Sequence, residues 1–195
     1  MYSNEMPLDR STLIEQARVY EQVEPLYTVE AEQLETLPTA LERGEFGWRD
    51  VVWIYRWYFR RHLGERPDSI RRQRESTFEE NQFEAVKRAI ELVTRTERLD
   101  DALAALIELR GVDLPAATAF LFFIDPHRYM VLGEREWTSL YEGTELGDPY
   151  PTEPTVASYR QYLKIIQSIA DRTGCGHWTI YRALWRLSTE TSKIR

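Results

Sequence analysis

A glycine marks a sharp break between two helical segments, in the run Leu109-Arg110-Gly111-Val112-Asp113. Glycine adopts backbone angles that are closed to other residues, so it permits a tight turn directly into the next helix. Successive backbone N–H groups at the start of that helix point outward and can hold a phosphate oxygen, with help from the helix dipole. The spacing therefore predicts phosphate binding by Gly111, Val112 and Asp113.

Arginines are concentrated in a second stretch, residues 56–74. It holds seven arginines against two acids, in a chain whose net charge is −7. A guanidinium group suits two-pronged binding of phosphate, and nearby aromatic rings can stack on a base extruded from a duplex. The candidate phosphate ligands are Arg56, Arg60, Arg61, Arg71 and Arg72, and the candidate stacking residues are Trp53 and Trp57. The alternative is a solvated helical face whose arginines pair with glutamates and whose tryptophans belong to the core.

The sequence offers little for metal or cysteine chemistry. The three histidines are far apart, and Cys175-Gly176-His177 is too sparse for a zinc site, so we expect no metal and no cofactor. One cysteine cannot form an intramolecular disulfide, which fits a reducing compartment. The N-terminal residues lack the pattern of a signal peptide and no apolar run reaches membrane-spanning length, so we expect a cytoplasmic protein with no membrane partner.

Nearly every long segment has the helical period, which predicts an all-α fold: a compact multi-helix domain that contains a helix-hairpin-helix motif. We expect residues 1–27 to be an N-terminal helical extension and residues 28–195 to be the main domain. The expected helices cover residues 11–23, 28–42, 48–63, 77–96, 99–109 and 115–124, a segment from about 134, and residues 156–173 and 178–189.

Residues 99–140, and more weakly the aromatic segment 177–187, resemble the helix-hairpin-helix superfamily of base-excision DNA glycosylases, of which endonuclease III is the best-known member. In that superfamily the hairpin reads Leu-Pro-Gly-Val-Gly-x-Lys-Thr-Ala. The lysine is the nucleophile of bifunctional members, and an aspartate about eighteen residues later is the general acid/base or stabilises the cation. The resemblance implies a base-excision repair fold that binds DNA. The cysteine cluster that holds iron and sulfur in some members is absent.

The chain keeps the superfamily's turn and departs from its reactive positions. Four residues match the hairpin: Leu109, Gly111, Val112 and Ala117. The second glycine falls on Asp113, whose carboxylate would oppose a phosphate, although an Asp before a helical proline is also typical of a helix cap. The lysine position falls on Pro115, which has no nucleophilic atom, and the aspartate position falls on Gly133.

Two other acids are candidates for the missing catalytic group. Glu134 is one residue beyond the aspartate position, which turns its side chain by about 100° on a helix. Asp125 could act with His127 in the preceding loop, although an Asp-Pro pair is also typical of a turn. No residue is assigned a catalytic role from the sequence, and we lean toward a protein without enzymatic activity.

Three functions remain open. The hypothesis that we favour is a glycosylase-like protein that binds the DNA backbone without excising a base. A second is a divergent active glycosylase that uses a non-standard acid. A third is a protein-interaction domain that has lost DNA binding, which the acidic net charge and Asp113 favour.

Overall fold

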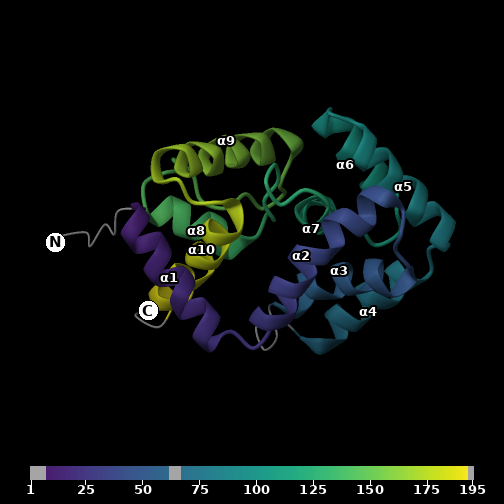
Figure 1. Ribbon diagram of the computed structural model, residues 1–195, viewed down its shortest axis with the longest axis horizontal. Helices are drawn as coiled ribbons and strands as arrows, with labels where there is room; N and C mark the ends of the chain where they lie inside the picture. The colour runs from purple at the N-terminus through teal and green to yellow at the C-terminus, as the bar shows by residue number, and fades with distance from the viewer. Residues whose placement is uncertain (1–7, 62–66, 193–195) are drawn as a thin grey trace. The chain divides into compact units, whose positions relative to one another are not determined.

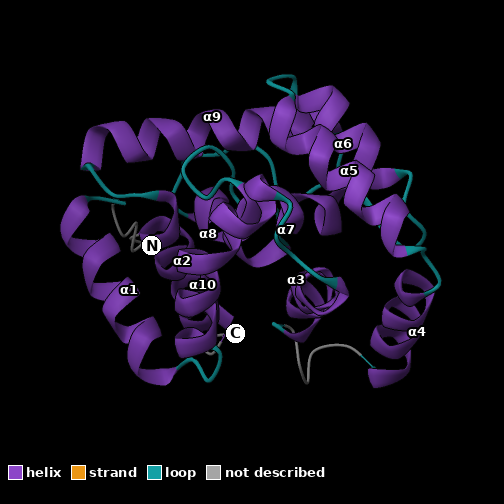
Figure 2. Ribbon diagram, turned by 45° about the vertical axis from the view of Figure 1, so that its right-hand side comes forward, coloured by secondary structure: helices purple, strands orange, loops and turns teal. Residues whose placement is uncertain are grey.

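The computed structural model describes residues 8–61 and 67–192, with side chains to residue 188. Residues 1–7 of the predicted extension, and His62, Glu65 and Arg66 of the arginine-rich stretch, lie outside the described residues. The described chain forms ten α-helices and no strand (Figures 1 and 2), which confirms the all-α prediction. The helices are α1 (Arg10–Val23), α2 (Tyr27–Arg43), α3 (Trp48–Arg60), α4 (Asp68–Glu79), α5 (Phe83–Arg95), α6 (Leu99–Ile107), α7 (Leu114–Ile124), α8 (Glu134–Glu142), α9 (Val156–Thr173) and α10 (His177–Ser192).

The predicted helix over residues 77–96 is wrong in one respect, because the structure divides it between α4 and α5. The amide of Asn81 donates to the carbonyl oxygen of Phe78 at 2.7 Å and so satisfies a backbone group at the end of α4. Helix α4 itself was not predicted before residue 77. Its apolar stripe is weak, since Glu75 and Phe78 are its buried residues.

The chain separates into two compact units: unit 1 comprises residues 1–32 and 127–195, and unit 2 comprises residues 33–126. The predicted N-terminal extension belongs to unit 1, where α1 packs along α10. The domain boundary expected after residue 27 stays a prediction. None of the helices in the described ranges combines the length and apolar character needed to cross a membrane.

Unit 1 is organised around α10, which contacts α1, α8 and α9. The ring of Tyr20 on α1 meets those of Trp178 and Tyr181 edge-on, at 6.0 and 5.9 Å between centroids. The extended segment before α8 is held by α9, because the hydroxyls of Tyr159 and Tyr162 donate to the carbonyl oxygens of residues 130 and 131. These contacts fix the chain that leads into α8.

Unit 2 has an aromatic core between α3, α4 and α7. The ring of Tyr55 stacks on that of Phe78 at 4.2 Å, and Phe120 lies 5.8 Å from Phe78. All three side chains are essentially inaccessible to solvent. Helices α5 and α6 lie side by side (Figure 1), and both contact α7. This core holds the turn between α6 and α7 in place.

Candidate functional site

The turn between α6 and α7 has the left-handed glycine that the sequence predicts. Gly111 has a φ of +80°, and a Cβ atom there would lie 3.2 Å from both the backbone nitrogen of Phe78 and the hydroxyl of Tyr55. That spacing is tighter than ordinary van der Waals contact. Glycine is therefore required at position 111 by both the backbone conformation and the close approach of α3 and α4.

Two side chains clamp this turn, one from α3 and one from the loop between α4 and α5. The hydroxyl of Tyr55 donates to the carbonyl oxygen of Gly111 at 2.7 Å. Asn81 accepts from the N–H of Arg110 and donates to its carbonyl oxygen, each at 2.9 Å. Burial raises the pKa of Tyr55 well above its usual value, so its hydroxyl keeps the proton that it donates. The turn is thus positioned by residues 29 to 56 positions earlier in the chain.

The backbone N–H groups of the turn are in part available to a ligand. The N–H of Val112 is used within the turn, on the carbonyl oxygen of Leu109, and the Val112 side chain is buried. In the described part of the chain no acceptor meets the N–H groups of Gly111, Asp113 and Leu114. Pro115 contributes none, because its nitrogen carries no hydrogen. The N–H groups of Asp113 and Leu114 at the helix start, and that of Gly111 before it, can donate to an anion.

Asp113 caps α7. Its carboxylate accepts from the N–H of Ala116 at 3.0 Å, and its other oxygen lies 3.3 Å from Arg74 of α4. Both side chains are half-exposed. Arg110, within the turn, pairs with Glu80 at 3.0 Å. Two arginines, Arg110 of the turn and Arg74 of α4, are therefore each partly neutralised by a neighbouring carboxylate.

Three of the predicted arginines converge on one carboxylate, Glu75, which the sequence analysis did not single out. Its oxygens lie 3.0 Å from Arg71, 3.5 Å from Arg60 and 3.8 Å from Arg56. We call these four residues the Glu75 cluster. The side chain of Glu75 is 10% exposed, whereas those of Arg56 and Arg60 are 38% and 43% exposed. The hydrogen bond to Glu75 raises the pKa of Arg71 further above its usual range.

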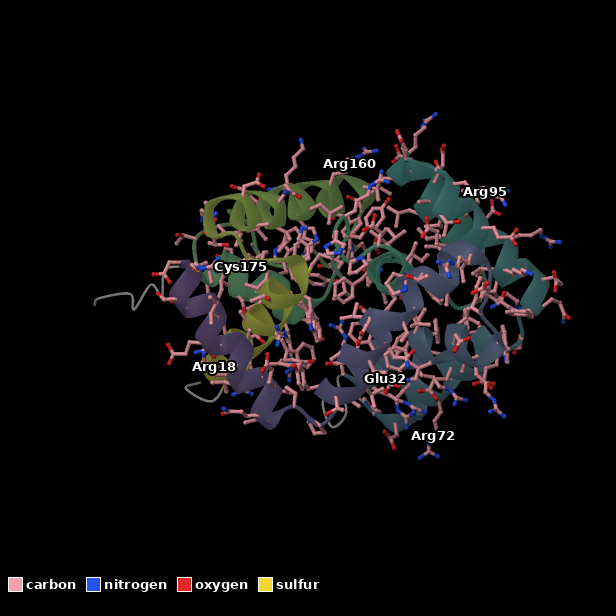
Figure 3. All side chains as sticks on the ribbon, in the orientation of Figure 1. Arg18, Glu32, Arg72, Arg95, Arg160 and Cys175 are labelled. Atoms are coloured by element: carbon pink, nitrogen blue, oxygen red, sulfur yellow. The ribbon has the colours of Figure 1, made fainter. Side chains whose placement is uncertain are left out.

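The other predicted ligands lie apart from this cluster. Arg72 pairs with Asp68 and points outward from α4, as Figure 3 shows. Arg61 is buried over the rings of Trp57 and Tyr58, at 4.8 and 4.9 Å. These residues do not converge on the turn in the way that Arg74 does.

The two candidate stacking residues both contact Phe123 of α7. Trp53 is half-buried and meets the Phe123 ring edge-on at 5.2 Å. Trp57 is 3% exposed, with Phe123 at 4.8 Å and Phe122 at 6.3 Å. A base can therefore reach the face of Trp57 only if these neighbours move, whereas Trp53 retains some accessible surface.

The candidate acids have different surroundings. Asp125 is half-buried at the end of α7 in unit 2. In unit 1, Gly133 caps α8 and Glu134 is its exposed first residue. Glu136, two residues on, is completely buried and was missed by the sequence analysis. Glu136 precedes Leu140 by four residues, so the two side chains share one face of the helix, and this spacing could have predicted that Glu136 is buried. The described residues contain no group of three or more potential metal ligands.

The residues that the sequence analysis missed are those whose role comes from packing. Glu75 follows Arg71 by four positions, the spacing of an ion pair on one helix, so that part of the cluster was readable from the sequence. The pairing of Arg74 with Asp113 and the clamp by Asn81 join segments far apart in the chain. No local pattern signals such contacts.

The described residues are all helical or in connecting loops, and a left-handed glycine turn leads into a capped, small-residue helix, which confirms the predicted all-α fold with its helix-hairpin-helix motif. A solved structure with this fold is that of the 8-oxoguanine glycosylase/lyase of Methanocaldococcus jannaschii, in complex with a 15mer DNA containing 8-oxoguanine. The similarity has a TM-score of 0.51 and covers 91% of this chain and 97% of that chain, at 14% sequence identity. No protein-family model matches the chain, and neither does any curated protein.

Proposed function

We propose that this protein binds the DNA backbone through the turn between α6 and α7 and does not excise bases. The observation that carries the proposal is the turn itself: Gly111 at positive φ, with the N–H groups of Gly111, Asp113 and Leu114 unmet by any acceptor in the described ranges. The fold it shares with a glycosylase/lyase solved on DNA supports a nucleic-acid ligand for that turn.

The chemistry of two positions argues against base excision. A lyase forms a Schiff base through an amine, and at the position where the resemblance puts that lysine the chain has Pro115. The whole chain has three lysines, none of them between residues 99 and 140. At the position of the aspartate stands Gly133, with no acid to donate or accept a proton. The protein is thus proposed to hold DNA without cutting the glycosidic bond.

The charge distribution sets the expected strength of binding. A net charge of −7 repels DNA at long range, and Asp113 adds a negative charge at the turn. We therefore expect a dissociation constant on the order of 10⁻⁵ M near physiological salt, in the range of non-specific binding. Log affinity should fall linearly with log salt, by about 0.9 for each phosphate that an arginine neutralises.

The test combines binding and chemistry on the same preparation. Fluorescence anisotropy with a labelled duplex measures affinity across a salt series. The same duplex carrying 8-oxoguanine or an abasic site is then assayed for base release, strand cleavage and borohydride trapping. We expect salt-dependent binding with none of these three products, whereas absence of binding at low salt would refute the proposal.

Base release from the 8-oxoguanine duplex would instead establish the divergent glycosylase. The responsible acid would then be found by comparing Glu134→Gln, Asp125→Asn and Glu136→Gln. Borohydride trapping of a covalent complex would show that an amine of the chain acts as the nucleophile although position 115 is proline. Each of these results contradicts the proposed function.

A further inference from the structure

The Glu75 cluster gathers three guanidinium groups of α3 and α4 around one carboxylate. This carboxylate has little exposed surface, and two further carboxylates, on Glu79 and Asp68, balance the remaining positive charge. Arg56 also pairs with Glu79, and Arg71 lies 3.5 Å from Asp68. Arg60 contacts Glu75 at 3.5 Å, and its side chain is 43% exposed. Three like charges held together would repel each other without the carboxylate between them.

A central carboxylate fixes the geometry of the arginines around it. An unrestrained arginine loses much rotamer entropy when it binds a ligand. Arg71, whose side chain is 19% exposed, has already lost this rotamer entropy on folding. Arg56 and Arg60, which are more exposed, have lost part of it. A guanidinium has five N–H donors and one carboxylate contact occupies few of them. Arg60 can therefore contact Glu75 and still donate to an outside anion.

The cluster is continuous with the turn between α6 and α7. Arg74, which contacts Asp113 at the turn, lies on α4 three residues after Arg71. Three residues on a helix correspond to a rise of roughly 4.5 Å and to nearly the same face. Successive phosphates of one DNA strand advance by about 3.4 Å along the duplex axis. A strand held at the turn can thus follow α4 to the cluster.

We propose that the Glu75 cluster is a second contact for the phosphodiester backbone of the DNA held at the turn, with Glu75 as the residue that positions its arginines. This inference rests on the proposed function, because it concerns the same DNA ligand. Arg60 and Arg56 contact phosphate directly. Glu75 does not contact DNA, and its role is to hold the three guanidinium groups in one place.

The decisive variant is Glu75→Gln, because charge and positioning predict opposite results. Removing a negative charge from a DNA-binding face should tighten binding if charge alone matters. If Glu75 positions the arginines, the variant binds at least about threefold more weakly, and the slope of log affinity against log salt becomes shallower by about 0.9, the value for one phosphate contact. Glu79→Gln is the comparison variant, since it removes an equal charge from a 40% exposed partner of Arg56 on the same helix but leaves all three arginines in contact with Glu75. It should bind as well as the unchanged protein or more tightly.

A second pair of variants keeps the test valid if Glu75→Gln does not fold, as judged by circular dichroism. Arg60→Gln alters a half-exposed side chain and should make the salt slope shallower by about 0.9. The matched control is Arg98→Gln, which removes an equal charge at a 75% exposed side chain before α6 and should leave the slope unchanged.

The outcomes separate the two proposals. If the unchanged protein does not bind DNA even at low salt, the proposed function fails and this inference fails with it. If the protein binds, but Glu75→Gln tightens binding as Glu79→Gln does, the positioning role is refuted. If Arg60→Gln and Arg98→Gln have equal salt slopes, the second backbone contact is refuted while binding at the turn stands.

Discussion

Replacing Asp113 by asparagine should tighten the binding of DNA. The carboxylate caps α7 through the N–H of Ala116 and lies beside the three N–H groups that we propose for phosphate. Asparagine caps helices as well as aspartate does, so the turn should keep its conformation. The change removes one negative charge from the proposed site and releases Arg74, the partner of Asp113 at 3.3 Å.

The size of the effect follows from Coulomb's law. A phosphate oxygen that accepts from the turn would lie roughly 6 Å from the carboxylate of Asp113, given ordinary hydrogen-bond lengths. Repulsion at that distance is about 0.7 kcal/mol at the dielectric constant of water and about 3 kcal/mol at an effective value near 20. Asp113 is 42% exposed and paired with Arg74, which favours the lower end. We expect about 1 kcal/mol, or roughly fivefold tighter binding.

The assay is fluorescence anisotropy with a labelled duplex, from about 50 mM to about 200 mM salt, the range over which phosphate contacts weaken. Asp101→Asn is the matched control. Asp101 is 47% exposed in the first turn of α6, the helix whose other end leads into the turn. It lies roughly 10 Å along that helix from the turn, about one Debye length away, so its effect on affinity should stay below about twofold.

A phosphate site at the turn is refuted if Asp113→Asn binds no more tightly than Asp101→Asn while both proteins unfold at similar temperatures. The loss of the exposed ion pair to Arg74 should cost at most about 1 kcal/mol of stability, so a folded variant is expected. An unchanged affinity would mean that the phosphate does not lie at the turn. Weaker binding would mean that Asp113 assists the ligand through another contact.

Three further predictions concern the clamp around the turn and the buried tyrosines. Gly111→Ala should lower the free energy of unfolding, measured by urea denaturation, by about 3 kcal/mol. Gly44→Ala should lower it by only about 1 kcal/mol, because Gly44 also has a positive φ but a Cβ atom there meets open space. Equal losses would show that the atoms around Gly111 move aside easily. Asn81→Ala should cost about 2 kcal/mol in the same measurement, because it removes three hydrogen bonds that hold the turn to the end of α4; a loss within error of zero would contradict the clamp. Burial raises the pKa of Tyr20 and Tyr55 above the usual 10.0, so the folded state favours their protonated forms. This contribution to stability is fully present below pH 10 and is lost as the pH rises through the raised pKa values. Tyrosinate absorbance should therefore show a late step that coincides with alkaline unfolding, and a single titration of all tyrosines near pH 10 would refute this.

Much of the fold was readable from local pattern. The helical period predicted α9 at its observed ends, and the glycine break predicted the turn before α7. The proline at residue 115 lies in the first turn of α7, where its missing N–H costs no hydrogen bond. The prediction failed at α4, whose first turns are charged and lack an apolar stripe. Its position depends on contacts with α3, which no local pattern contains.

The candidate site divides in the same way. The sequence by itself determined which groups are present: a glycine that can take a positive φ, an arginine-rich stretch, and no lysine or aspartate at the positions the resemblance implies. The tertiary structure decided which of them meet: Tyr55 and Asn81 on the turn, Arg74 on Asp113, and three arginines on Glu75. The physical reason is the separation along the chain over which each interaction acts. Backbone angles and contacts within one helical turn depend on neighbours in the chain, whereas ion pairs and clamps between helices exist only after the core of Phe78 and Phe120 has packed.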